Sequence, residues 1–547
     1  MADRTLQSAA VMAAGTVLSR LLGFVRISLL AAAIGVGLRA DIFTVANTIP
    51  NSLYILLAGG VFNTVLVPQL VRAIKEHDDG GRDFTNRLLT AGFVVLAVLT
   101  TACVLLAPFI ANLYMPDELQ QASRAAERAD ILFFVQLCLP QIFFYGAFVL
   151  VGQVLNANRR FGPMMWAPIA NNIVACLSIV AFMLIYGVGG EPATYTQSEQ
   201  LLLGLGHTLG IAVQLLVLLP YLSAIGHPYR PKFGLRNTGL GRTAKLGVWT
   251  LLFVAVNQVT LVVVTKLALA GTAGTEVESA AKAGLFAYTT AMLIILVPHG
   301  IVTVSLATAA LPQMSSLAAD KDVTEVARVS ARSIRQTLAI VVPAAAAMLA
   351  FAEPITSVIA EYGAAKGKTE LMAYTLMALA LGLVPFTVQY FQLRTFYAFE
   401  DTRTPFLLQV GIATFNITAA LVGVRMILTD LRYSGVALAA AWSLTYLVGV
   451  LLSRVALSRR VPHVHGAGFA LPMLAMMIAA AVGAAVGWGG LYLLGMVTNW
   501  SGPLTSAVKL AIAGLLMLPV YVGLARVLRI HEVTDLVTMV TSRLRRR

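Results

Sequence analysis

The chain has 547 residues, of which 58% are hydrophobic and only 12% are charged, and its mean hydropathy is +0.82. This balance excludes a soluble globular protein and a disordered chain, and it identifies an integral membrane protein. The net charge of +14 does not indicate a nucleic-acid partner, because the basic residues are spread over the connections between apolar segments instead of forming one patch.

Apolar segments follow one another along the whole chain, and most reach the length of about 20 residues that a membrane-spanning helix needs. The first cannot be a cleaved signal peptide, because it is too long and has no small-residue cleavage site. We therefore expect an all-α polytopic membrane protein with fourteen transmembrane helices, at residues 8–34, 41–71, 88–113, 131–155, 163–186, 201–222, 244–270, 283–311, 337–362, 372–399, 405–428, 435–457, 467–496 and 504–528.

Two arginines, Arg20 and Arg26, lie inside the first of these segments. A guanidinium group within the membrane is costly unless it faces water or an anion. Residues six positions apart lie about 120° apart around a helix, so both side chains can border one cavity. The alternative is that each side chain reaches up to a membrane interface, which suits Arg26, nearer the helix end, better than Arg20.

The distribution of basic residues predicts the orientation of the chain. When the connections are assigned alternately to the two sides, most of the 39 lysines and arginines fall on the side of the N-terminus. Basic residues are enriched in cytoplasmic connections, so both termini are expected in the cytoplasm. A count wrong by one helix would mix the two sides, so this separation also favours fourteen helices.

An internal repeat divides the chain. Three pairs of features recur at nearly one spacing: Pro68 and Pro312 in matching Pro-Gln motifs, Arg39 and Lys282 before matching segments, and Pro163 and Pro405 after polar turns. A repeat unit of six helices leaves both copies in the same orientation, and such proteins move substrates by alternating access. We expect lobes at residues 1–235 and 236–460, followed at 461–547 by two further helices and a basic cytoplasmic tail.

The first helices of each lobe would line a cleft between the lobes. They carry the unusual polar residues Arg20, Arg26 and Asn51 in the first lobe, and Asn257 and Lys266 in the second. Lys266 lies near a helix end and could equally reach the interface. Because few carboxylates accompany these groups, the cleft is positive, which predicts an anionic substrate carrying phosphate or pyrophosphate.

Nothing in the sequence indicates catalysis. The chain has no phosphate-binding loop of the nucleotide-hydrolase kind, and His463 and His465 have no partners at metal-ligand spacing. The three cysteines all fall in apolar segments, which argues against disulfides. We therefore expect a transporter that is not an enzyme, with no cofactor and no metal.

Several motifs resemble the MurJ (MviN) family of lipid II flippases, over nearly the whole chain. They are Ser19-Arg20-Leu21-Leu22-Gly23-Phe24-Val25-Arg26, Ala40-Asp41-Ile42-Phe43, Ile49-Pro50-Asn51 and, most specifically, Arg394-Thr395-Phe396-Tyr397-Ala398 with Asp401-Thr402-Arg403-Thr404-Pro405. The resemblance implies the fold of the multidrug/oligosaccharidyl-lipid/polysaccharide exporter superfamily. It implies export of lipid II across the bacterial cytoplasmic membrane, with Arg20, Arg26 and Asp41 in the central cavity.

This chain differs from many family members at two places, and the resemblance also implies partners. Many family members have a basic pair in helix 2 and an Asp-Arg pair in helix 8, where this chain has Tyr54-Ile55 and Ala291-Met292-Leu293-Ile294. Lys266 or Lys282 could substitute in the second lobe. The implied partners are lipid II and membrane lipids, with cell-wall synthesis or division proteins as further candidates.

Three alternatives differ from a lipid II flippase. One is a flippase for another polyprenyl-linked saccharide. Another is a multidrug antiporter, which would need carboxylates in its cavity where this chain has arginines. The last is a membrane scaffold that recruits cell-wall enzymes, which would leave the intramembrane arginines without a purpose.

Overall fold

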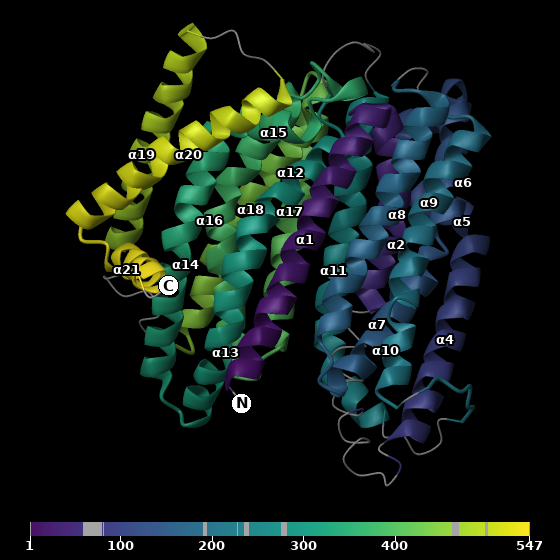
Figure 1. Ribbon diagram of the computed structural model, residues 1–547, viewed down its shortest axis with the longest axis horizontal. Coiled ribbons are helices and arrows are strands. Elements are labelled where there is room, and N and C mark those ends of the chain that lie inside the picture. Colours follow the sequence, from purple (N-terminus) through teal and green to yellow (C-terminus); the bar gives the residue numbers. More distant parts are fainter. Residues whose placement is uncertain are drawn as a thin grey trace. The chain divides into compact units, whose positions relative to one another are not determined.

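The computed structural model describes residues 2–57, 70, 79, 81–189, 194–226, 228–234, 240–274, 282–461, 470–497 and 502–545. Every regular element in these ranges is a helix (Figure 1). The chain forms two compact units, Met1–Glu276 with Tyr362–Lys366 and Val277–Glu361 with Gly367–Arg547. The predicted all-α membrane fold is confirmed.

The first unit contains the long N-terminal helix and most of the elements before residue 276. Its elements are α1 (Ala2–Ile34), α2 (Leu38–Leu57), α4 (Arg82–Leu105), α5 (Ala107–Tyr114), η2 (Asp117–Gln120), η3 (Ala122–Arg124), α6 (Ala125–Cys138), α7 (Gln141–Ala157), α8 (Gly162–Tyr186), α9 (Gln197–Leu216), α10 (Leu219–Ala224), α11 (Leu240–Ala273) and η5 (Gly363–Ala365).

The second unit contains the remaining helices, two of which continue through a π-helical turn. Its elements are α12 (Leu285–Pro298), η4 (His299–Thr303), α13 (Val304–Ala319), α14 (Val323–Ala350), α15 (Ala352–Ala360), α16 (Glu370–Ala398), α17 (Arg403–Leu421), η6 (Val422–Ile427), η7 (Leu431–Tyr433), α18 (Ser434–Ser458), α19 (Ala470–Val497), α20 (Pro503–Val527) and α21 (His531–Arg545).

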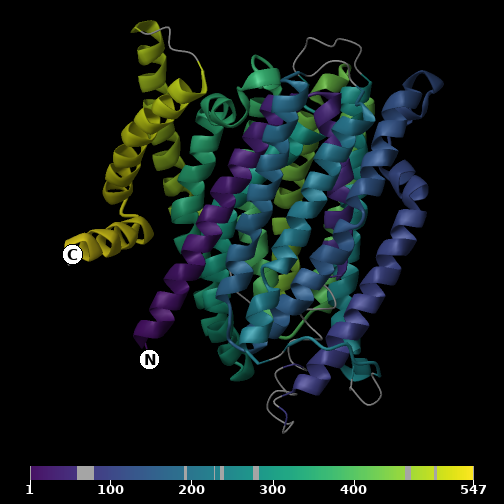
Figure 2. The same ribbon diagram turned by 45° about the vertical axis from the view of Figure 1, so that its right-hand side comes forward.

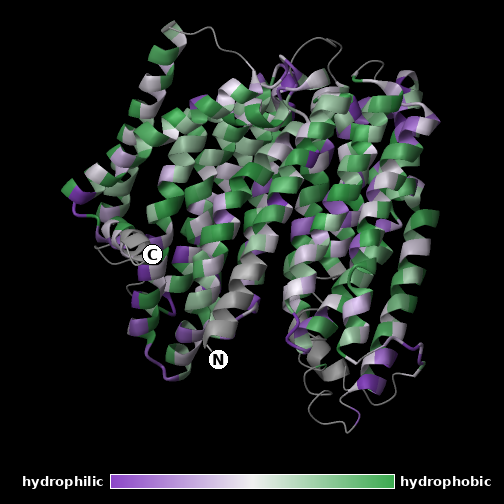
Figure 3. Cartoon of the chain, in the orientation of Figure 1, coloured by the Kyte–Doolittle hydropathy of each residue, from purple (hydrophilic) through white to green (hydrophobic). Residues whose placement is uncertain are grey.

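Thirteen stretches of the described residues are long and apolar enough to cross a membrane. Hydrophobic residues predominate along the helices of each unit, and hydrophilic ones gather toward their ends (Figure 3). The predicted span 41–71 continues beyond α2 into residues outside the described ranges, which also contain Pro68 of the repeat. The count of fourteen helices is therefore not confirmed.

The contacts of α11 place it in the first unit, where it packs on α2 and α5. The internal repeat instead begins the second lobe at residue 236. Contacts divide the chain by which surfaces pack together, whereas the repeat divides it by which segments match in sequence. The two boundaries therefore need not coincide. The lobe boundaries at 235 and 460 stay a prediction.

Close helix packing in both units depends on small residues, as expected where lipid gives no hydrophobic drive for association. A Cβ atom on Gly206 of α9 would lie 2.0 Å from Ser178 Oγ of α8, and one on Gly382 of α16 would lie 2.5 Å from Ser443 Oγ of α18. Neither site has room for a side chain, so these glycines set how closely their helices approach.

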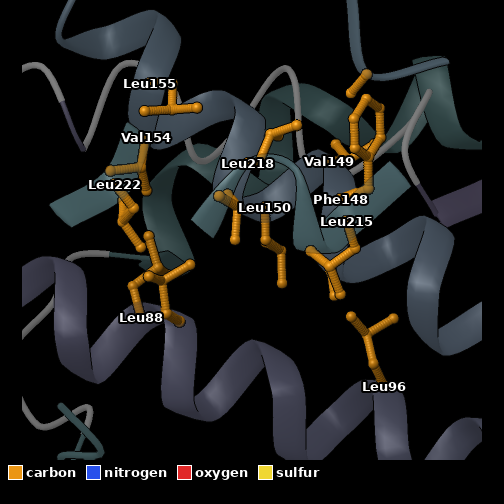
Figure 4. Close-up of a cluster of buried hydrophobic side chains, with 14 of the residues drawn as sticks. Leu88, Leu96, Phe148, Val149, Leu150, Val154, Leu155, Leu215, Leu218 and Leu222 are labelled. Atoms are coloured by element: carbon orange, nitrogen blue, oxygen red, sulfur yellow. The ribbon is translucent and has the colours of Figure 1, made fainter. Parts of the chain in front are cut away.

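A cluster of buried aliphatic side chains forms one core of the first unit (Figure 4). Leu88 and Leu96 of α4 face a row on α7 that includes Leu150 and Val154, and Leu218 closes the cluster beside α10. Because lipid replaces water around these helices, the leucines contribute through close van der Waals packing. The cluster holds α4 to the helices that carry the polar residues described below.

The C-terminal helix α21 lies at the end of α20, turned sharply away from it (Figure 2), and contacts α20 and α14. The turn at Arg529, whose φ is 55°, ends α20 and redirects the chain. An ion pair of 2.7 Å between Arg335 Nε of α14 and Glu532 Oε1 fixes the start of α21. The helix is amphipathic, a pattern typical of helices that lie in the plane of a membrane surface.

Candidate functional site

Helix α1 carries both intramembrane arginines, and its packing on α8 fixes their position along the neighbouring helix. Asn172 Nδ2 of α8 donates a hydrogen bond of 3.0 Å to the carbonyl oxygen of Ser19, the residue before Arg20. The side chains of Arg20 and Arg26 are both half-buried. They are therefore neither sealed in the core of the unit nor fully presented on its surface.

Neutral groups surround Arg26. The guanidinium lies close enough to Tyr145 of α7, Cys176 of α8 and His207 of α9 for its charge to act on all three. Tyr145 in turn stacks on Tyr54 of α2, with ring centroids 4.8 Å apart. Tyr54 occupies the place where many family members have a basic residue.

No carboxylate in the described part of the chain forms an ion pair with Arg20 or Arg26. A guanidinium that is partly withdrawn from water and lacks a protein counter-ion retains its full attraction for an anion. No described carboxylate thus neutralises the charge of either side chain.

Asp41 lies elsewhere in the unit and is completely buried. It falls in the first turn of α2, where a carboxylate is stabilised by the helix dipole. Its Oδ2 atom accepts a hydrogen bond of 2.7 Å from Thr272 Oγ1 at the end of α11. This contact joins α2 to α11.

Asn51 and Lys266 occupy different surroundings. Asn51 is exposed on α2, directly after the helix-bending Pro50. Lys266 of α11 pairs with Asp117 Oδ1 at 3.3 Å, and the two side chains are 34% and 80% exposed. Because Asp117 lies in a connection outside the predicted spans, this pairing favours the interface explanation for Lys266. Its role in substrate binding stays a prediction.

A buried polar network at the start of α2 was missed by sequence reasoning. Arg39 Nη2 pairs with Glu199 Oε1 of α9 at 2.8 Å, and these side chains are 6% and 12% exposed. The guanidinium also lies 4.2 Å from the ring centre of Tyr195, whose hydroxyl donates to the Arg39 carbonyl oxygen. Burial raises the pKa of the Tyr195 hydroxyl, so that group remains a donor.

The network extends to α6 through Asp130. Its carboxylate accepts hydrogen bonds from the Tyr195 amide and from Gln200 Nε2, both at 2.9 Å. Only one part of the network has a local sequence signal, the capping box formed by Thr196 and Glu199 at the start of α9. The remaining partners are far apart in the chain, so no spacing rule could have found them.

The second unit has apolar side chains along α12 and aromatic side chains packed around the turn that follows it. Ala291 and Ile294, in the region where many family members have an Asp-Arg pair, are buried apolar residues. One turn further, His299 begins a π-helical turn and stacks on Phe386 with ring centroids 4.2 Å apart. π-Helical turns are frequent at functional sites. Pro298, directly before this turn, is a sequence feature that favours a bend.

The motif that most specifically matched the family has a structural explanation in the second unit. Asp401 accepts hydrogen bonds from the Thr404 amide and hydroxyl at 2.9 and 2.6 Å, and it pairs with Arg460 Nη2 at 2.8 Å. Burial alone would raise the pKa of Asp401, but the hydrogen bonds from Thr404 and the charge of Arg460 lower it below its ordinary value. The motif fastens the start of α17 to the end of α18.

The described residues show no group of three or more His, Cys, Asp or Glu that could hold a metal ion. Thirteen candidate spans, with two arginines inside the first, define a polytopic helical membrane protein.

Comparisons with known proteins specify the family. A family model described as lipid II flippase MurJ matches residues 30–502, and the chain belongs to this family. It is similar to a probable lipid II flippase MurJ from Rhizobium meliloti (27% identity over 88% of this chain and 86% of the relative) and to one from Haemophilus influenzae (26% over 89% and 92%). A lipid II flippase MurJ from Burkholderia cenocepacia is 28% identical over 73% of this chain and 74% of its own.

Solved structures agree on the fold. A lipid II flippase MurJ in an inward closed conformation matches with a TM-score of 0.70 at 18% identity, over 95% of this chain and 99% of that chain. An inward-facing multidrug resistance transporter of the MATE family matches with a TM-score of 0.62 at 14% identity, over 82% and 98%. The second match shows that the antiporter alternative belongs to a related group with the same fold, and it carries no further support for that alternative.

Proposed function

We propose that this protein exports lipid II, the polyprenyl-pyrophosphate-linked peptidoglycan precursor, across the cytoplasmic membrane by alternating access. Membership of the MurJ family and the names of its relatives support this substrate. The observation that carries the proposal is the pair of half-buried arginines, Arg20 and Arg26, which have no carboxylate partner among the described residues.

The pyrophosphate of lipid II would bind to these two arginines. A guanidinium presents a planar fork of N–H donors that matches adjacent phosphoryl oxygens, and it keeps its charge at all accessible pH values. Exposed Asn51 adds an uncharged donor and acceptor on α2. Asp41 would act indirectly, by fixing α2 on α11 through Thr272.

Transport in the proposed direction requires an orientation, and the basic connections predict that both termini face the cytoplasm. A reporter enzyme that is active only in the cytoplasm should therefore work when fused after residue 545. An active periplasmic reporter at the same position would contradict this orientation.

Complementation tests the function itself. A bacterium depleted of its own lipid II flippase should resume growth when this chain is expressed, and lipid II should become accessible on the outer face of its membrane. Growth without accessible lipid II would contradict direct export. Failure of both, in cells where the chain is folded in the membrane, would favour a flippase for another polyprenyl-linked saccharide.

A further inference from the structure

A cavity of about 590 Å³ lies in the second unit, and none of the candidate site residues discussed above lines it. It is bordered by the end of α14, by α15, by the connection to α16 and by α19 and α20. The polar and aromatic side chains that define it are Glu353, Glu361, Glu370, Tyr374, Trp488 and Lys509. The lining thus combines acidic, basic and aromatic groups.

None of the three carboxylates forms an ion pair with another described residue. Glu361 accepts hydrogen bonds of 2.6 Å from the Gly367 amide and from Thr369 Oγ1. Glu370 Oε1 accepts one of 2.8 Å from the Tyr374 hydroxyl. Three carboxylates against one lysine leave the lining with a net negative charge, so the cavity attracts a cation.

The cavity lies at the ends of four membrane spans. The stretches 323–350 and 470–496 end beside it, and the stretches 370–398 and 503–527 begin there. Trp488 is 55% exposed and stacks on Tyr492 with centroids 5.6 Å apart, as in the aromatic belts that mark a membrane interface. Exposed Val482 and Leu515 continue an apolar surface along α19 and α20. The cavity therefore lies at headgroup depth.

We propose that this cavity binds the headgroup of a phospholipid with a primary ammonium group, phosphatidylethanolamine. The ammonium would donate to the carboxylates of Glu353 and Glu370, and the phosphate would lie toward Lys509 on α20. The acyl chains would follow the apolar surface of α19 and α20. An anionic headgroup does not fit, because it would face three carboxylates with one lysine to offset them. The proposal is independent of the exported substrate.

Trp488 provides a direct probe of this site. Purified protein is placed in phospholipid nanodiscs that contain a bromine-labelled fraction of one lipid, and bromine quenches the fluorescence of a tryptophan that it contacts. The Trp488→Phe variant gives the contribution of the other tryptophans, which is subtracted. We expect brominated phosphatidylethanolamine to quench Trp488 at about a tenfold lower mole fraction than brominated phosphatidylglycerol, the effect of about one charge-assisted hydrogen bond.

Matched lipids and variants separate charge from shape. Brominated phosphatidylcholine has the same charges but no N–H donors, so it should quench less than phosphatidylethanolamine. The double variant Glu353→Gln/Glu370→Gln should lose the preference, whereas Glu400→Gln, at an exposed carboxylate outside the cavity, should keep it. Glu361 is left unchanged because it holds the connection before α16.

Three results would overturn the proposal. The first is equal quenching by all three lipids. The second is a preference that survives the double substitution in a folded protein. The third is a saturable response of Trp488 to Mg²⁺ without any lipid preference, which would identify a cation site.

Discussion

The membrane spans of the two compact units differ in the polar groups that they hold. In the first unit, Arg20 and Arg26 are half-buried among neutral side chains, with no carboxylate partner among the described residues. In the second, α12 is apolar around Ala291 and Ile294, and His299 directly after it joins a set of stacked aromatic rings. The two units thus differ in kind, because α1 of the first carries charged side chains within a span, whereas α12 of the second carries none.

The aromatic cluster of the second unit is continuous across three helices. Phe386 of α16 contacts Tyr446 of α18, with centroids 4.6 Å apart, as well as His299. Stacked rings fix the relative position of helices and present surfaces that bind apolar or sugar faces, but they do not select pyrophosphate. We therefore expect charge recognition to depend on Arg20 and Arg26 of the first unit.

The first unit also contains the buried ion pair between Arg39 and Glu199, which stabilises the fold. Removing this pair should have the largest effect on stability. Arg39→Ala leaves Glu199 buried without its partner, so we expect it to destabilise the protein by about 3–5 kcal/mol. Thermal unfolding of the purified protein in detergent measures this loss. Arg87→Ala, which removes a half-exposed pair with Asp83, should cost no more than about 1 kcal/mol. Equal effects of the two substitutions would contradict a structural role for Arg39.

In the second unit, the lowered pKa of Asp401 predicts a smaller, pH-dependent effect. Because the folded-state pKa lies below the unfolded one, the stabilisation by Asp401 is complete above the unfolded value, near pH 4, and is lost as the pH falls through the folded value. Asp401→Asn should lower stability by about 1 kcal/mol at pH 7 and by less at pH 3. A difference from the wild type that does not shrink on acidification would contradict the ion pair with Arg460.

Substitution of Lys266 should have the smallest effect. It tests whether the substrate site at Arg20 and Arg26 includes a basic residue of α11. Since its pair with Asp117 is exposed, Lys266→Gln should change stability by less than about 1 kcal/mol and leave lipid II export near the wild-type rate. Export at matched membrane abundance is the measurement. A loss of export as large as that of Arg26→Ala would instead indicate that Lys266 belongs to the substrate site.

Sequence reasoning predicted the fold well, because spans are defined by local composition. It also located Arg20 and Arg26 inside a span, since a charge within an apolar segment is visible in the chain itself. The surroundings of Asp41 could not be predicted, because its partner Thr272 is far away in the sequence. The same holds for Arg39, which pairs with the distant Glu199. Side-chain partners across helices depend on helix rotation, which no local pattern specifies.

We propose that Arg20 and Arg26 bind a pyrophosphate. Measuring lipid II export by four single variants at matched membrane abundance tests this most directly. Arg26→Ala should reduce export at least about tenfold with near-normal folding, because a charge-assisted contact to the substrate is lost. Arg20→Ala should fall in the same direction, and Arg20→Lys and Arg26→Lys should keep partial activity, since lysine supplies charge without the planar fork. Wild-type export by both alanine variants would contradict the account and leave these arginines as interface anchors.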